Sequence, residues 1–205
     1  LTDFGRIQKE NYYYVDKTMF IEKIEMQPSY LFLIRPDASG NINEVEESFR
    51  MHCCGKLSDF VYRYEHLLGK DIWKVLDEKT KEEPGAFLSA INTYATRKGD
   101  IKIYLLIDEY DNFTNTILST YGMDLYRKAM HGEGYIRRFF NVIKAATTGM
   151  GSAVNRLFIT GVSPVTMDDV TSGFNIGTNI TNDPWFNDLV GFSEKELREM
   201  LAYYK

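Results

Sequence analysis

Two adjacent carboxylates carry the strongest chemical signal in the sequence. Asp108 and Glu109 come directly after the apolar run Ile103 to Ile107, whose composition is typical of a buried parallel strand. Open α/β sheets bind ligands at the carboxyl ends of such strands. In P-loop nucleotide hydrolases this arrangement is called Walker B: the Asp holds magnesium and the Glu polarises the attacking water. A polar strand end leading into a turn, with Asp111 and Asn112 as turn formers, explains the same residues equally well.

A second apolar run ends in hydroxyl side chains. Leu157 to Ile159 is followed by Thr160, Gly161 and Ser163. On a strand beside the first one, such a hydroxyl would sense a γ-phosphate or hold the attacking water. Taken alone, a plain exit from strand to loop, with Gly161 as the permissive backbone position, is the simpler interpretation. The two strand ends together favour a nucleotide site.

The stretch YLFLIRPDASGNINEVEESF, residues 30–49, resembles a phosphate-binding loop but lacks its main parts. A strand-like run, Tyr30 to Ile34, ends in Arg35 and Pro36 and opens onto Gly40 and a helix. A phosphate cradle needs a glycine-rich backbone, a Lys for the phosphates and a Ser or Thr for magnesium. DASGNIN has one glycine, no lysine and an acidic residue, Asp37, that would repel a phosphate. The stretch as printed therefore cannot be a working phosphate loop.

Composition narrows the class of protein. A net charge of −5 over 205 residues argues against a protein that grips nucleic acid across its whole surface. No apolar run is long enough to span a bilayer and no secretion signal is visible, so a cytoplasmic protein is expected. The adjacent Cys53 and Cys54 are expected to be reduced thiols on a helix, with His52 beside them in a packing role.

The elements that must position these groups form an α/β pattern. A helix is expected at Tyr135 to Ala146, between the two apolar runs, so the middle of the chain is strand, helix, strand. From about residue 43 to 99 the apolar spacing is helical, with Gly55 and Gly69 as expected breaks. The last helix of this part has Pro84 near its start and Gly99 just past its end.

The two ends of the chain also show helical signals. The N-terminal residues are expected to begin as a loop, after which Asp16 can cap a helix. The last element opens with Ser193 and Glu196, a capping box, and is expected to pack Leu197 and Leu201.

With these residues assembled, the chain resembles the AAA-ATPase-like family of P-loop proteins found in gut Bacteroidetes and other anaerobes. The similarity runs from end to end. It rests on YYYVDKT at 12–18, FLIRP at 32–36, IDEYDNF at 107–113, FITGVSP at 158–164, TSGFNI at 171–176 and GFSEKEL at 191–197.

The resemblance implies a fold, a ligand and partners. It implies a P-loop NTPase-like parallel sheet flanked by helices, with an ATPase domain at 1–190 and the start of a C-terminal helical part at 191–205. ATP and Mg²⁺ are the implied cofactors. In this family a PD-(D/E)XK nuclease domain usually follows, so contact with nucleic acid is expected only indirectly, and none with a membrane.

The resemblance also assigns roles to residues. Asp108 would hold magnesium, Glu109 would activate water, and Thr160 or Ser163 would read the state of the γ-phosphate. Arg35 would lie at the entrance of the phosphate loop, although pairing with a carboxylate at the strand end is an equally good account. Tyr14, Asp16 and Lys17 would flank the adenine, although helix capping alone explains Asp16.

The sequence departs from the family directly after Pro36. There the family continues through Arg-Arg, an aromatic residue and Gly-Lys-Ser into a helix and a further strand. Either the encoded protein has residues between Pro36 and Asp37, or it truly lacks this segment. The first hypothesis is favoured, because deleting a strand and its crossover helix would leave unpaired backbone and an open core.

Two alternatives from other classes stay open. One is a non-catalytic regulatory or interaction module built on a degenerate P-loop fold. The other is a nuclease metal site made of Asp108, Glu109 and Asp111, which is weaker because no Glu-x-Lys lies on an adjoining strand.

Overall fold

The computed structural model describes residues 4–26, 30–33, 45–149, 151–161 and 177–204. The chain forms two compact units. Unit 1 combines residues 1–28 with 179–205, and unit 2 comprises residues 29–178. The division into domains at residue 190 stays a prediction.

Unit 2 is built on a small parallel sheet. Its strands are β1 (Tyr30–Leu33), β2 (Ile103–Ile107) and β3 (Val154–Thr160), and β4 (Thr178–Asn179) lies where the two units divide. The order is β2-β3-β1-β4, and both β1 and β2 run parallel to β3. The predicted strands are confirmed, with β3 beginning three residues earlier than expected; Ile34 lies outside the described residues.

The region predicted to be helical at about 43–99 is confirmed. It contains α3 (Val45–Arg63), α4 (Glu65–Leu68), α5 (Ile72–Val75), α6 (Glu78–Lys81) and α7 (Pro84–Lys98). Helix α7 begins with Pro84 and ends before Gly99, whose φ of 84° is the left-handed conformation that terminates helices. The predicted break at Gly55 is wrong: α3 runs through it, because a helix interior tolerates a single glycine at modest cost.

Three further helices separate β2 from β3. They are α8 (Asn112–Tyr121), α9 (Met123–Met130) and α10 (Tyr135–Thr148). Helix α10 was predicted from its apolar spacing. The sequence indicated only a turn at Asp111 and Asn112, whereas the structure continues from that turn into α8.

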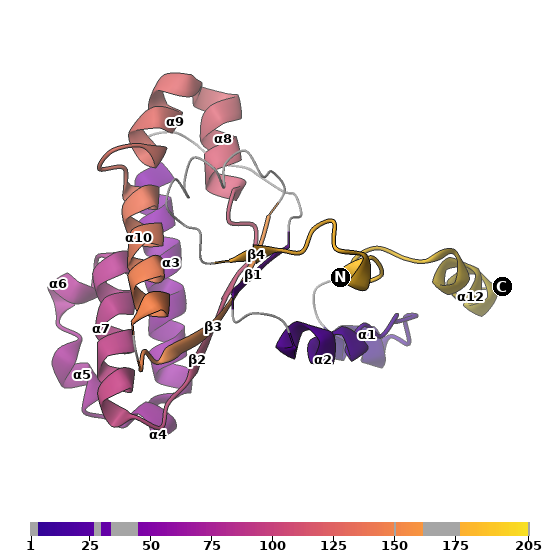
Figure 1. Ribbon diagram of the computed structural model, residues 1–205, viewed down its shortest axis with the longest axis horizontal. Coiled ribbons are helices and arrows are strands. Elements are labelled where there is room, and N and C mark those ends of the chain that lie inside the picture. Colours follow the sequence, from indigo (N-terminus) through magenta and orange to yellow (C-terminus); the bar gives the residue numbers. More distant parts are fainter. Residues whose placement is uncertain (1–3, 27–29, 34–44, 150, 162–176, 205) are drawn as a thin grey trace. The chain divides into compact units, whose positions relative to one another are not determined.

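The core of unit 2 lies between one face of the sheet and helices α3, α7 and α10 (Figure 1). Leu105 pairs in register with Leu157, and Ile107 with Ile159, so these side chains share the covered face. Leu157 and Ile159 are 0% and 1% exposed. The structure is thus a set of helices packed on a small parallel sheet, as an α/β class requires; the P-loop arrangement stays a prediction.

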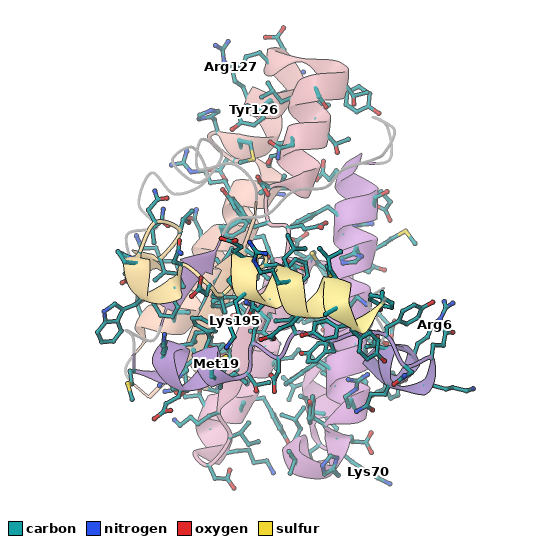
Figure 2. The ribbon with its side chains drawn as sticks, turned by 90° about the vertical axis from the view of Figure 1, so that its right-hand side faces the viewer. Arg6, Met19, Lys70, Tyr126, Arg127 and Lys195 are labelled. Atoms are coloured by element: carbon teal, nitrogen blue, oxygen red, sulfur yellow. The ribbon has the colours of Figure 1, made fainter. Side chains whose placement is uncertain are left out.

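Unit 1 brings the two ends of the chain together. It contains α1 (Phe4–Lys9), α2 (Met19–Glu25), a 3₁₀ turn η2 (Pro184–Phe186) and α12 (Glu194–Tyr203). Figure 2 labels Met19 at the start of α2 and Lys195 on α12. The capping box of Ser193 and Glu196 is confirmed.

Two expectations for unit 1 are wrong. The N-terminal residues predicted as a loop form α1. Leu197 and Leu201, expected to be packed, are 42% and 56% exposed. A helical spacing of apolar residues shows which side chains share a face, but it does not show whether another element covers that face.

No helix among the described residues is both long and apolar enough to cross a membrane.

Candidate functional site

The carboxyl ends of β2 and β3 lie side by side and are tied together by hydrogen bonds. The Thr160 hydroxyl donates to Asp108 Oδ1 and accepts from the Glu109 backbone N–H at 3.2 Å. The Tyr110 N–H donates to the Thr160 carbonyl at 2.9 Å. Asp108 is exposed and Glu109 is half-buried. Asp108, Glu109 and Thr160, which were predicted from the sequence, therefore meet at the carboxyl ends of two neighbouring strands.

Glu109 has an unusual backbone conformation. Its φ is 53°, the left-handed region, which costs an L-residue with a β-carbon about 1–2 kcal/mol. Such outliers persist where surrounding contacts hold them, and here the Glu109 N–H is held by Thr160. The bend turns the chain sharply at the end of β2, directly after Asp108.

Gly161 allows the end of β3 to approach the turn after β2. A β-carbon at position 161 would overlap the Tyr110 ring and come within 2.7 Å of Asp111 Oδ1. Tyr110 is 6% exposed, and its ring packs edge-on against Phe140 at 6.4 Å between centroids. A glycine is thus required for close approach rather than for its backbone angles.

Asp111 forms hydrogen bonds with the first turn of helix α8. It is fully buried, and its Oδ2 accepts from Asn115 Nδ2 at 3.0 Å. Its carbonyl accepts from the Asn115 N–H at 2.8 Å and from the Thr114 hydroxyl at 2.7 Å. Among the described residues no group of three His, Cys, Asp or Glu side chains could hold a metal ion. The nuclease metal site therefore finds no support in the described part of the chain.

A pocket of about 200 Å³ adjoins the two carboxylates. One wall is β2 and the turn after it, residues 105–110; the other comes from α3 and α10. The helix residues are Phe49, His52, Cys53, Lys56, Leu57, Phe139 and Phe140. Sequence reasoning missed this wall. The three- and four-residue spacing in α3 indicates a shared face, but only the fold shows that the face lies opposite β2.

The cysteines on α3 are free thiols, as predicted. Burial, with a smaller contribution from the neighbouring Cys54, raises the pKa of Cys53 to about 12. Burial also raises the pKa of Cys54. Both thiols are therefore poor nucleophiles and poor metal ligands near neutral pH, which fits the packing role expected for them.

The residues predicted to flank an adenine belong to unit 1. Lys17 Nζ makes a two-pronged ion pair with Glu196 at 2.6 and 2.8 Å. Asp16 Oδ1 accepts from the Thr18 hydroxyl and N–H at 2.7 and 2.8 Å, and these bonds lower the Asp16 pKa. Tyr14 is 47% exposed. Their contact with a nucleotide stays a prediction, and Arg35 and Ser163 lie outside the described residues.

The donor set suits magnesium carried by a phosphate ligand better than magnesium held by protein alone. Mg²⁺ usually keeps several waters and takes one or two protein carboxylates together with substrate phosphates. Asp108, exposed at the strand end with Thr160 beside it, supplies one such carboxylate.

Comparison with known protein families shows to which family the chain belongs. The family model described as "Predicted AAA-ATPase" matches residues 1–41 and 37–171. The chain belongs to the AAA-ATPase-like family. At family level this supports a nucleotide-binding, ATPase-like role. No match is found among curated proteins or among solved structures.

The match to the AAA-ATPase-like family comes in two parts that meet at residues 37–41. This is where the sequence departs from the family pattern, directly after Pro36. The break therefore coincides with the position where a phosphate-loop segment was predicted to be missing.

Proposed function

We propose that the encoded protein is a P-loop domain that binds ATP with Mg²⁺ and hydrolyses it. The observation that carries the proposal is the joined end of β2 and β3, where Asp108, Glu109 and Thr160 meet. Ligands of parallel α/β sheets bind at this end of the strands. The family membership supports the same role.

Each group has a part in this proposal. Asp108 holds magnesium directly or through its water shell, and the exposed carboxylate is accessible for this. Glu109 polarises the attacking water. The Thr160 hydroxyl fixes the Asp108 carboxylate and the Glu109 backbone at once, so a shift of either strand changes the geometry of both acids. Ser163 is the second candidate for sensing the γ-phosphate.

The phosphate-binding part must come from residues that the printed sequence lacks. Sheet order places β1 directly beside β3, so the chain leaves β1 next to the strand that carries Thr160. Arg35 and Pro36 follow β1 at once. We infer that the encoded protein has further residues between Pro36 and Asp37, including the lysine and hydroxyl residue of a phosphate loop.

Nucleotide binding by the gene-encoded protein tests the proposal. A fluorescent ATP analogue should bind in the presence of Mg²⁺ and lose affinity when the metal is chelated. The Glu109→Gln variant should bind this analogue like the wild type, while its turnover falls by about 10²- to 10⁴-fold, the usual contribution of a general base. Glu133→Gln, an exposed carboxylate on the turn before α10, is the matched control and should retain turnover.

A non-catalytic regulatory or interaction module is the second candidate function. The observation that favours it is the absence of a phosphate-binding lysine from the printed stretch DASGNIN. If the gene-encoded protein contains a phosphate loop and still shows no affinity for ATP, the ATPase proposal fails and this one stands. In either case the domain would regulate or power an associated domain, for which a nuclease is the candidate by family analogy.

A further inference from the structure

Asp111 occupies the N-cap position of α8, yet its side chain does not cap the helix. A capping carboxylate accepts a hydrogen bond from a backbone N–H two or three residues later. Within the described part of the chain, the Asp111 side chain makes no such bond. Asp77, at the N-cap of α6, shows the ordinary behaviour, because its Oδ1 accepts from the Thr80 N–H at 2.7 Å. The Asp111 carboxylate is therefore directed elsewhere.

Burial separates these two aspartates further. Asp77 is exposed, whereas Asp111 is 0% exposed. Carboxylates are almost never fully buried unless partner groups satisfy them. A surface aspartate would be enough to start a helix, as Asp77 does for α6. The burial of Asp111 thus indicates a contact inside the molecule rather than a role in starting α8.

The two oxygens of Asp111 face two different elements. Oδ2 accepts from Asn115 Nδ2 of α8 at 3.0 Å. Oδ1 lies at the end of β3, 2.7 Å from the place that a β-carbon on Gly161 would occupy. The ring of Tyr110 lies against the same glycine. Asp111 and Tyr110 together therefore fix where the chain leaves β3.

The position of Gly161 sets the position of Thr160, the residue directly before it. The Thr160 hydroxyl donates to Asp108 Oδ1 and accepts from the Glu109 N–H. Its carbonyl accepts from the Tyr110 N–H. Glu109 also has a left-handed φ of 53°, a conformation that persists only where neighbouring contacts hold it. A shift of Gly161 would therefore loosen the hold on both acids.

We propose that Asp111 is a positioning residue of the candidate site. Its carboxylate holds Gly161 in place, and this keeps the Thr160 hydroxyl where it orients Asp108 and Glu109. Because Asp111 is fully buried, it acts through Thr160 and not on the nucleotide itself. The inference rests on the proposed function for the reaction that this positioning serves, while the geometry can be tested without a nucleotide.

The Asp111→Asn variant of the gene-encoded protein tests the effect on the reaction. It keeps the shape of the side chain but replaces one acceptor oxygen with a donor group. ATP turnover per folded molecule should fall at least about tenfold, since a misplacement of about 1 Å in an active site costs about 10²-fold in rate. The affinity for the fluorescent ATP analogue should stay within about threefold of the wild type, because only the orientation of the acids changes.

Asp59→Asn is the matched control, because Asp59 is an exposed carboxylate on α3. This variant should retain both turnover and affinity. Circular dichroism gives the folded fraction of each variant. A role of Asp111 in stability alone would lower that fraction and leave the turnover per folded molecule unchanged.

Exchanging the two hydrogen-bonded side chains provides a rescue. In the double variant Asp111→Asn with Asn115→Asp, the new amide at position 111 can donate to the new carboxylate at position 115. Its oxygen then faces Gly161, so the bond between the two positions and the acceptor beside the glycine are both restored. Turnover should recover toward the wild-type value. A double variant as slow as Asp111→Asn contradicts the role of the acceptor.

Amide hydrogen exchange tests the geometry without a nucleotide. The Tyr110 N–H donates to the Thr160 carbonyl at 2.9 Å and so reports on the end of β3. In Asp111→Asn its exchange should accelerate at least about tenfold more than that of Ile143, which lies inside α10 and reports on opening of the core. Asn115→Ala removes only the bond to Oδ2. It should show the same effect on Tyr110 and decides the question if Asp111→Asn does not fold.

The outcomes separate this inference from the proposed function. Unchanged exchange of Tyr110 in the folded variants overturns the inference, even if ATP is hydrolysed. Unchanged turnover in Asp111→Asn overturns it as well. Faster exchange of Tyr110 in a protein whose wild type neither binds nor hydrolyses ATP supports the positioning by Asp111 and counts against the ATPase.

Discussion

Among the residues of the candidate functional site, Gly161 is the position where adding a single methyl group should be most disruptive. In the Gly161→Ala variant the new β-carbon would overlap the Tyr110 ring and lie 2.7 Å from the buried Asp111 carboxylate. The ring cannot swing aside freely, because it is 6% exposed and packs edge-on against Phe140. The end of β3 must move instead, which breaks the 2.9 Å bond from the Tyr110 N–H to the Thr160 carbonyl.

The size of the effect follows from known costs of overpacking. Extra methyl groups in a packed interior destabilise by about 1–3 kcal/mol, and the loss of the strand-end hydrogen bond places Gly161→Ala in the upper part of that range. For a chain of 205 residues, a loss of about 2–3 kcal/mol corresponds to a fall in Tm of about 4–12 °C. Urea unfolding followed by circular dichroism measures the change.

Gly55 provides the matched control for the same substitution. It lies inside α3, and a β-carbon there meets nothing within 4 Å. Gly55→Ala should therefore stabilise the protein by about 0.5–1 kcal/mol, because alanine loses less conformational freedom in a helix. If Gly161→Ala is as stable as the wild type, the close approach of β3 to Tyr110 is wrong, and with it the packing of the site.

Three other perturbations test separate parts of the structure. Leu157→Ala, at a fully buried position between the sheet and the helices, should destabilise the protein by about 2–5 kcal/mol in urea; a loss below about 1 kcal/mol contradicts the core. The hydrogen-bonded ion pair with Lys17 lowers the pKa of Glu196 from its ordinary 4.5, so the stability it contributes is present above that value and lost as the pH falls through the lowered pKa. The difference between wild type and Glu196→Gln should thus be largest near neutral pH and vanish once the pH has fallen below the lowered pKa; a difference independent of pH refutes the pair. Iodoacetamide at about pH 8 should modify Cys54 before Cys53, since burial raises the pKa of Cys53 to about 12; equal rates, measured by mass spectrometry, argue against the buried position of Cys53.

Helices and strands could be predicted from the sequence wherever a single strong local pattern indicated them. The apolar run from Ile103 to Ile107 is β2, and the helix framed by Pro84 and Gly99 is α7. The prediction was wrong where two local patterns indicated different structures, such as a glycine inside a run with helical spacing. Gly55 was predicted as a break, but the helix on both sides of it outweighs the modest cost of one glycine.

The candidate site was predicted in part. Asp108, Glu109 and Thr160 were selected because polar residues follow buried strands, and the structure brings them together through the pairing of β2 with β3. The wall contributed by Phe49, Lys56 and their neighbours on α3 was not predicted. It depends on how a helix more than forty residues earlier in the chain packs on the sheet, which no local pattern encodes.

The sequence by itself determined which residues can do chemistry and where the strands and most helices form, and it predicted that a segment is missing after Pro36. These properties depend on residue type and on short-range spacing. Only the tertiary structure decided the strand order, the close packing at Gly161 and the pairing of Lys17 with Glu196. Each of these depends on contacts between residues far apart in the chain.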